Sequence, residues 1–205
     1  MALRNAVMAA LLEGEASGYE LAKGFEASVA NFWTATAQQI YRELERMAGE
    51  GLVAARVVQQ ERRPNKRLYS LTGAGLEAVR AYTAEVSSKP MALRDELLVK
   101  IQSVDAGDLE AVRAGVLERV ERSAARLARF ERAQQRLLAG RGEGEFLTTA
   151  ERVGPYLTLL GGLALERANV QWGRRTVLQA LERRAAAQGS GRSRPEAGPA
   201  RPALH

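Results

Sequence analysis

Four side chains that can form paired hydrogen bonds lie close together in the sequence, at Gln38, Gln39, Arg42 and Arg46. A glutamine amide offers a donor and an acceptor that match adenine, and a guanidinium can donate to N7 and O6 of guanine. This segment therefore carries the chemistry needed to read base edges in the major groove of DNA. The alternative is that these side chains only face solvent on the outer side of a helix.

A helix is predicted from Thr36 to about Glu50. Thr36 and Gln39 match a capping box, in which the threonine hydroxyl accepts from the third amide and the glutamine side chain reaches back to the cap. Gly51 can adopt the left-handed conformation that ends a helix. The unpaired amides at the helix start, together with the Thr36 hydroxyl, suit a phosphate, which the positive end of the helix dipole also favours.

One face of this helix is apolar. Ile40, Leu44 and Met47 are spaced by four and three residues, which places them in one buried stripe. At about 100° per residue, Gln38 and Arg42 project nearly opposite that stripe, and the other two polar side chains lie on its flanks. The helix is thus anchored on one side and offers long polar side chains on the other, as a recognition helix does.

A basic β-hairpin is predicted after this helix. Residues 52–59 alternate like a strand, Pro64 fixes φ in a turn, and residues 66–72 form the returning strand. Residues 56–67 carry five basic side chains against Glu61 alone, and we expect them to neutralise phosphates or to enter the minor groove. The contact candidates on the hairpin are Arg62, Arg63, Asn65, Lys66 and Arg67.

The predicted elements of residues 1–86 come in the order helix, helix, helix, hairpin, helix. The first helix covers about 3–12, the second follows a capping box at Ser17–Glu20, and Thr72 caps the last. This is the order of a winged helix-turn-helix, so residues 1–86 are predicted to be a DNA-binding domain. Net charge adds no support, because this segment has ten basic and ten acidic side chains.

The composition excludes most enzyme chemistries. The 205 residues contain no cysteine, and the only histidine is His205, so thiol nucleophiles, histidine triads and most zinc sites are excluded. The acidic pair Asp95 and Glu96 is expected to face solvent on an amphipathic helix. No apolar run approaches the roughly 18–20 residues of a membrane span. The sequence therefore predicts a cytoplasmic protein that is not an enzyme, has no membrane segment and uses no cofactor or metal.

Residues 87–187 are predicted to form a helical domain. Asp105–Asp108 opens a long helix that reaches about Ala139, and three glycines in the segment 140–145 end it. Apolar residues along this helix alternate spacings of four and three, which is typical of a coiled-coil seam. The seam consists of Val116, Val120, Ser123, Leu127, Phe130, Gln134 and Leu137.

The final helix is expected to supply a dimer interface. It is predicted to open at a capping box, Thr148–Glu151, and to reach Ala187, before a disordered tail over 188–205. The pair Gly161-Gly162 costs about 1 kcal/mol per glycine, which is easiest to explain if another helix crosses closely. Its apolar surface exceeds what one helical hairpin covers, so two subunits are expected to exchange these helices. The candidate dimer contacts are Leu127, Phe130, Tyr156, Leu157, Leu160, Gly161, Leu165 and Trp172.

Several segments resemble one known family. SGYELAKGFE, QQIYRELERMAGEGLV, RLYSLTGAG and RDELLVKI resemble the PadR family of transcriptional regulators, and YLTLLGGLALERANVQW resembles the C-terminal helical domain of its longer-chain subfamily. The resemblance implies that Tyr19 and Tyr41 lie at the DNA-proximal surface and that the wing spans residues 59–66. Some members of that family hold aromatic ligands with tryptophans near the dimer interface, which makes Trp33 and Trp172 candidates for an effector site. Simple packing is the favoured role for both.

The predicted fold is mainly α-helical with a small β-hairpin: an N-terminal winged helix-turn-helix and a C-terminal helical dimerisation domain. The predicted function is a homodimeric, sequence-specific transcriptional regulator, a repressor by resemblance, which binds an inverted-repeat operator in double-stranded DNA. A winged-helix protein-interaction module and an enzyme acting through carboxylates and lysines are the alternatives. A steep salt dependence of duplex binding would favour the DNA-binding regulator over the protein-interaction module. The sequence has no glycine-rich phosphate loop to support an enzyme.

Overall fold

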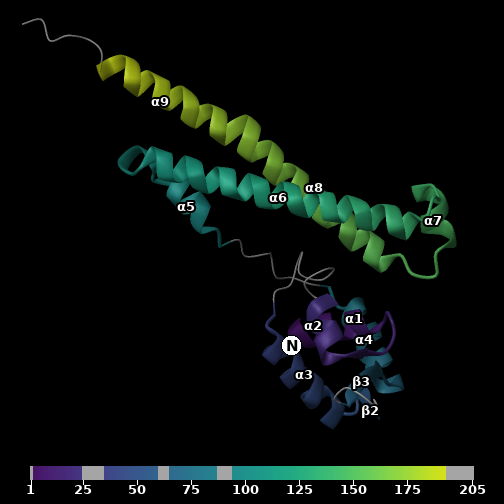
Figure 1. Cartoon of the computed structure of the whole chain (residues 1–205). Coiled ribbons are helices and arrows are strands. Elements are labelled where there is room, and N and C mark those ends of the chain that lie inside the picture. The colour runs from purple at the N-terminus through teal and green to yellow at the C-terminus, as the bar shows by residue number, and fades with distance from the viewer. Residues whose placement is uncertain (1, 25–34, 60–64, 87–93, 193–205) are drawn as a thin grey trace, which may run out of the picture. The chain divides into compact units, whose positions relative to one another are not determined.

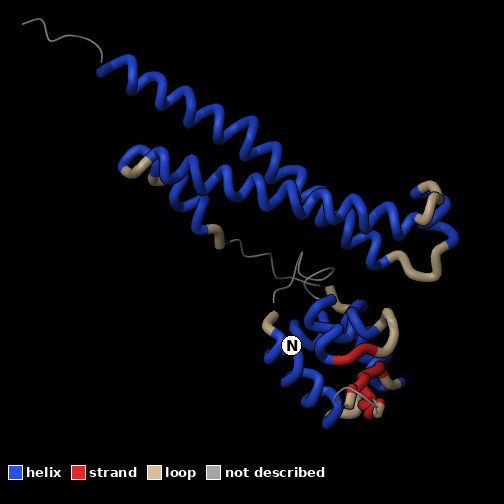
Figure 2. The backbone as a smooth tube through the Cα atoms, viewed as in Figure 1, coloured by secondary structure: helices blue, strands red, loops and turns tan. Residues whose placement is uncertain are grey.

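The chain divides into two compact units, Met1–Met91 and Ala92–His205. In this computed structural model the first unit combines helices with a small antiparallel sheet, and the second consists of helices (Figures 1 and 2). The predicted fold class is therefore confirmed. No helix in the described ranges is long and apolar enough to cross a membrane. The described residues are 2–24, 35–59, 65–86 and 94–192.

The first unit contains a three-stranded antiparallel sheet. Its elements are α1 (Ala2–Leu11), β1 (Ala16–Ser17), α2 (Gly18–Gly24), α3 (Ala37–Gly49), β2 (Val53–Val58), β3 (Lys66–Leu71) and α4 (Gly73–Ala84). β3 is the central strand, with β2 paired along its length and β1 paired opposite Leu68 and Tyr69. The sequence predicted β2 and β3 but not β1, because two residues carry no recognisable alternation.

Local sequence signals explain where the helices of this unit begin. The Ser17 hydroxyl accepts from the Glu20 amide at 3.2 Å, and the Glu20 carboxylate accepts from the Ser17 amide at 2.9 Å. Thr72 caps α4 by accepting from the Gly75 amide at 3.0 Å. Both predicted caps are confirmed. A Cβ at Gly75 would collide with the Leu52 carbonyl oxygen, so glycine lets the start of α4 approach the residue before β2.

The core of the first unit joins α1, α2 and α3 to the sheet. The apolar faces of the helices meet the inward-facing residues of β2 and β3, and burial of this surface is the main stabilising contribution. Its buried residues are Ala6, Val7, Met8, Leu11, Leu21, Ile40, Leu44, Met47, Val53 and Tyr69. The orientation of α3 is therefore set by contacts with three other elements.

The second unit is built on a long helical hairpin. Its elements are α5 (Glu96–Gln102), a 3-10 turn (Val104–Ala106), α6 (Leu109–Leu138), α7 (Glu143–Thr149), α8 (Gly154–Trp172), a π-helical segment (Gly173–Leu178) and α9 (Gln179–Arg192). α6 lies along α8 and the π-helical segment (Figure 1). The last helix continues to Arg192, so the tail predicted over 188–205 begins too early; residues 193–205 lie outside the described ranges.

The ends of α6 are where the sequence predicts them. Asp108 caps the helix by accepting from the Ala111 amide at 3.0 Å. Ala139, with a φ of 49°, adopts the left-handed conformation that ends it. The glycine-rich segment after it does stop α6, but a new helix, α7, starts at Glu143 inside that segment.

The predicted capping box at 148–151 is wrong. Thr148 and Thr149 lie inside α7, and their hydroxyls donate to the Glu145 carbonyl at 3.0 and 2.7 Å. Threonine can satisfy its hydroxyl by bonding back to its own helix, which here replaces the capping role. α8 instead begins at Gly154, with a proline in its first turn, where a missing amide costs nothing.

The expectation that Asp95 faces solvent is also wrong. Asp95 caps α5 by accepting from the Leu97 amide at 3.0 Å, and its two oxygens accept from the Arg119 guanidinium, one of them at 2.7 Å. Its side chain is 14% exposed, whereas that of Glu96 is 86% exposed. Arg119 holds the pKa of Asp95 below its usual value. This pair fastens α5 to α6.

Two apolar clusters hold α6 against the following helices. The first contains Val112, Val116, Val120, Val177, Leu178 and Leu181, and the second contains Phe130, Leu159 and Leu163. Buried polar residues lie between the clusters along the helices: Ser123, and Glu166, which pairs with Arg126 at 2.9 Å. Most of the predicted seam of α6 therefore packs on α8, the π-helical segment and α9 of its own chain, whereas Leu137 at its end is 36% exposed.

Candidate nucleic-acid interface

The start of α3 has the geometry predicted from the sequence. The Thr36 hydroxyl accepts from the Gln39 amide at 3.2 Å, and Oε1 of Gln39 accepts from the Thr36 amide at 2.8 Å. Ile40, Leu44 and Met47 are at most 1% exposed. The capping box and the buried stripe are confirmed. Oε1 of Gln39 is engaged in the cap, and the amide nitrogen of this side chain can still donate to a base.

The opposite face of α3 is open. Gln38 and Arg42 are exposed, and Tyr41 beside them is 43% exposed. The Tyr41 ring lies against Gly18, where a Cβ would collide with it, so glycine allows α2 to approach α3. Tyr19, next to this glycine, is 67% exposed. These four side chains meet the first condition for contact with DNA, and the contacts themselves stay predictions.

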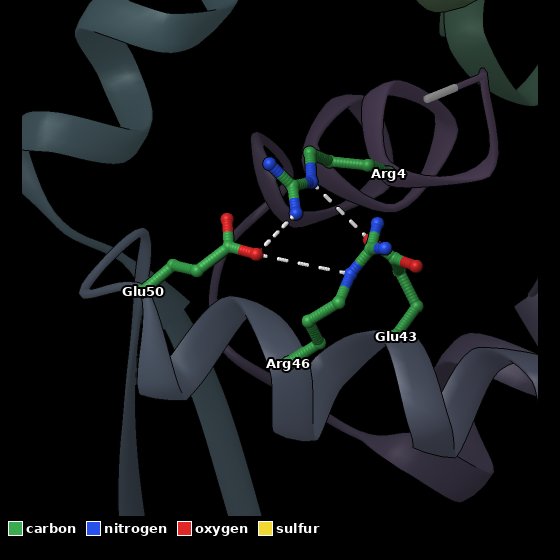
Figure 3. A network of polar contacts seen from close by, with 4 residues as sticks. All are labelled: Arg4, Glu43, Arg46 and Glu50. Atoms are coloured by element: carbon green, nitrogen blue, oxygen red, sulfur yellow. Dashed lines mark hydrogen bonds and ion pairs between the residues drawn. The ribbon is translucent and has the colours of Figure 1, made fainter.

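Arg46 belongs to a network of four charged side chains (Figure 3). Its guanidinium donates to Glu43 at 2.7 Å and lies 3.8 Å from Glu50. Arg4 of α1 pairs with the same two carboxylates, at 3.3 and 2.6 Å. The hydrogen bond that Arg4 donates to the Glu50 carboxylate raises the pKa of Arg4 above its usual value. Arg4 therefore joins α1 to α3, whereas Arg46 pairs with carboxylates of its own helix and its C-cap. The Arg46 side chain is still 52% exposed, so its contact with a base stays a prediction.

Each basic side chain of the hairpin within the described residues pairs with a carboxylate. The pairs are Arg56 with Glu15 at 2.8 Å, Lys66 with Glu20 at 2.7 Å, and Arg67 with Glu45 at 2.6 Å. In the described part of the hairpin, the positive patch predicted over 56–67 is therefore largely neutralised. Asn65 is exposed, and Arg62 and Arg63 lie outside the described residues.

Glu45 connects α3 to the hairpin. Besides pairing with Arg67, it accepts a hydrogen bond from the Tyr69 hydroxyl at 2.8 Å. Burial and this hydrogen bond raise the pKa of Tyr69 to about 12, so the phenol stays a donor at neutral pH. The Arg67 guanidinium lies 5.2 Å from the centre of the Tyr69 ring. This cluster sets the angle between α3 and β3. No local sequence pattern predicts the cluster, because Glu45 lies 22 and 24 residues before its partners.

Lowering the pH should loosen the contact between α2 and the hairpin. Lys66 and the Ser17 amide and hydroxyl lower the pKa of Glu20 from 4.5 to about 2. Because the folded-state value lies below the unfolded one, the stabilising contribution is complete above about pH 4.5 and is lost as the pH falls towards about 2. We expect Glu20→Gln and Lys66→Gln each to weaken the acid dependence of the melting temperature. An unchanged profile in both variants would contradict this role.

The described hairpin cations should contribute little to the salt dependence of DNA binding. A phosphate would have to displace Glu20 and Glu45, so Lys66→Ala combined with Arg67→Ala should change the slope of log affinity against log salt only slightly. Replacing Arg62 and Arg63 should lower that slope by roughly 0.9 for each phosphate that the variant no longer binds. Titrations with one duplex at several salt concentrations test both. Equal falls in the two double variants would show that the ion pairs open on DNA.

The predicted dimer contacts divide into two groups. Phe130 and Tyr156, at 4% and 0% exposed, are covered by the chain's own helices. Leu127 and Leu160 pack against the Phe130 cluster, and Trp172 packs against the first cluster of the unit. By contrast, Leu157 and Leu165 are each 51% exposed, and Gly161 has open space where a side chain would lie. Of the eight predicted dimer contacts, the ones left open to a second subunit on α8 are therefore Leu157, Gly161 and Leu165.

Comparison with known proteins identifies the family. The profile described as "Transcriptional regulator PadR-like family" matches residues 7–81, and "Virulence activator alpha C-term" matches residues 93–187. "Probable transcriptional regulator Rv1176c" of Mycobacterium tuberculosis is 33% identical over 181 residues, which cover 84% of this chain and 94% of that protein. This chain belongs to the PadR-like family of transcriptional regulators.

Other known proteins also match most of the length of this PadR-like regulator. The "Negative transcriptional regulator PadR" of Bacillus subtilis is 25% identical over 170 residues, covering 83% of this chain and 92% of that protein. The crystal structure of Bacillus subtilis PadR in complex with operator DNA has a TM-score of 0.73 at 24% identity, covering 88% of this chain and 99% of that one. The Vibrio cholerae virulence activator AphA has a TM-score of 0.63 at 29% identity, covering 89% and 99%.

The two profiles fall on the two units of this PadR-like protein. The first matches within Met1–Met91, which holds the winged helix, and the second matches within Ala92–His205. The protein is thus a DNA-binding winged-helix regulator, and its family consists of transcriptional regulators rather than enzymes.

Proposed function

We propose that this PadR-like regulator is a homodimeric repressor. Two copies of α3 read an inverted-repeat operator, and a small aromatic molecule relieves repression. The observation that carries the proposal is the outer face of α3, where Gln38 and Arg42 are exposed opposite a fully buried stripe. A helix held this firmly can present its side chains to base edges in one orientation, which sequence-specific reading requires.

The exposed face of α8 supports the dimer. Leu157, Gly161, Ala164, Leu165 and Ala168 are all exposed, and their spacing of four, three, one and three places them on one face. A second copy of the same helix can cover this face, and the absence of a side chain at Gly161 allows two backbones to approach closely. Such an interface is isologous, so the complex has the two-fold symmetry that an inverted repeat requires.

The repressor role and the effector rest on relatives. The Bacillus subtilis relative is named a negative regulator. A crystal structure of that PadR in complex with p-coumaric acid has a TM-score of 0.66 at 24% identity, covering 88% of this chain and 95% of that one. Of the two tryptophan candidates, Trp172 packs against the first apolar cluster of its unit, and Trp33 lies outside the described residues. We propose an aromatic acid as the class of effector.

Selection of bound duplexes from a random pool tests this function. The full-length protein should enrich an inverted repeat whose half-site centres lie one helical turn apart, roughly 34–36 Å, or a multiple of that distance. Footprinting of the protein on the enriched site, with and without aromatic acids, tests whether such an acid releases the protein from DNA. Enrichment of sites without symmetry would contradict the dimeric model.

The second candidate is a protein-interaction module, in which the same face of α3 binds another protein. Tyr19 and Tyr41, exposed beside Arg42, favour it because tyrosine and arginine are common anchors in protein interfaces. The salt dependence of binding separates the two candidates, since only phosphate contacts release condensed counterions. A salt-insensitive protein complex without duplex binding would favour the module.

A further inference from the structure

The outer face of α6 carries a row of arginines. Residues 122–141 contain six arginines and a single acidic residue, Glu131, so this stretch has a net charge of +5. Five of the six lie at Arg122, Arg126, Arg129, Arg132 and Arg136, and we call these the arginine stripe. At about 100° per residue they share a sector of roughly 120° that points away from the apolar face of the helix.

The stripe is straight and open. At about 1.5 Å per residue it extends over roughly 21 Å of α6. The side chains of Arg122 and Arg126 are 64% and 47% exposed, and the other three are exposed too. α5 packs on α6 further towards its start, through Asp95 and Arg119. α8 and α9 occupy the opposite, apolar face of α6.

Most of the positive charge of the stripe has no carboxylate close to it. Arg126 pairs with Glu166, and Arg122 lies 3.8 Å from Glu118. Within the described residues, no ion pair involves the three arginines at 129, 132 and 136. Glu131, the acidic residue within this stretch, pairs with Arg167 of α8 instead, at 3.4 Å. The end of the stripe after Arg126 is therefore a concentrated, uncompensated cationic surface.

We propose that the arginine stripe is a second nucleic-acid contact, which binds the phosphate backbone of duplex DNA independently of base sequence. Duplex DNA carries about one negative charge per 1.7 Å of its axis, so a row of cations about 21 Å long meets several phosphates. Guanidinium groups bind phosphate oxygens through two parallel hydrogen bonds, which makes arginine better suited than lysine to this contact.

The composition of the stripe favours DNA over an acidic protein. Stable protein interfaces usually have a large apolar or aromatic anchor at their centre. The side chains that accompany the arginines on this face are small, such as the exposed Ala125. Charge without an anchor is sufficient for phosphates, since release of counterions supplies the affinity.

A triple variant of the full-length protein tests the proposal. Arg129→Gln, Arg132→Gln and Arg136→Gln remove three charges from the stripe. The matched control, Arg174→Gln, Arg175→Gln and Arg183→Gln, removes three exposed charges from the π-helical segment and α9. The measurement is the affinity of each protein for a random-sequence duplex at several salt concentrations. Thermal melting of both variants confirms that they are folded.

The log-affinity slope of the stripe variant is expected to fall by roughly 0.9 for each phosphate that it no longer binds, hence by up to about 2.7, while the control keeps the wild-type slope. The operator selected from a random pool should stay the same in both, since the stripe reads no bases. An unchanged slope in the stripe variant, or equal falls in both variants, would overturn the proposal. Loss of binding to polyglutamate by the stripe variant alone, with an unchanged DNA slope, would instead assign the surface to an acidic protein.

Discussion

A protein carrying Leu157→Asp and Leu165→Asp is expected to be a monomer under conditions in which the unchanged protein is a dimer. Each leucine is 51% exposed in the single chain, so the substitutions should leave the fold of the unit intact. In the proposed dimer they would bury unpaired carboxylates against a second copy of α8, which is strongly unfavourable. Operator affinity should fall by roughly 10²–10⁴-fold, because the two copies of α3 are no longer linked.

Sedimentation velocity gives the oligomeric state, and titration of the selected operator gives the affinity. Leu147→Asp combined with Leu117→Asp is the matched control, because these leucines are 39% and 36% exposed on α7 and α6, away from the exposed apolar face of α8. The control should stay dimeric and bind normally. A dimer that survives the α8 substitutions would show that another surface joins the subunits.

The features that the sequence predicted correctly are those determined by neighbouring residues. The capping boxes at Ser17 and Thr36 and the cap at Asp108 each need one side chain within three residues of an amide. The buried stripe of α3 needs only helical periodicity. These signals place the recognition helix and its rotation, so its open face could be predicted from the sequence alone.

The electrostatics of the interface could not be predicted in this way. The carboxylates that neutralise Arg56 and Lys66 come from residues 41 and 46 positions earlier in the chain, and Glu45 meets Arg67 across 22 residues. Summing charge over a segment ignores such partners. Arg4 shows the same limit, because its partners Glu43 and Glu50 lie 39 and 46 positions later in the chain.

Periodicity also leaves open what covers an apolar face. The seam of α6 is apolar whether it meets another subunit or its own chain, and the structure shows that α8 and α9 of the same chain cover it. Along α8, Tyr156 faces inward and Leu157 outward, although both are large and apolar. The packing of the helical hairpin is needed to tell which of these residues belong to the core and which are available for a dimer.

Arg42→Ala is expected to change the operator that the protein selects. If the guanidinium donates to N7 and O6 of one guanine, its removal should cost about 1–3 kcal/mol at each half-site. The two copies in a dimer then weaken operator binding by roughly 30-fold to 10⁴-fold, taking about 1.4 kcal/mol as tenfold. The effect should concentrate at one symmetric pair of positions, where the variant accepts other bases. Selection from the same random pool, followed by titration of single-base variants of the operator, measures both effects.

Arg80→Ala is the control, since Arg80 is equally basic and exposed but lies on α4, paired with Glu77. It should leave the base preference unchanged at every position of the operator. The distinction matters because removing any cation weakens binding to DNA slightly through the phosphates, whereas only removing a base-reading side chain changes preference at a defined position. A uniform fall in the affinity of Arg42→Ala, with the same preferred bases, would show that Arg42 binds the backbone and that another side chain of α3 reads the sequence.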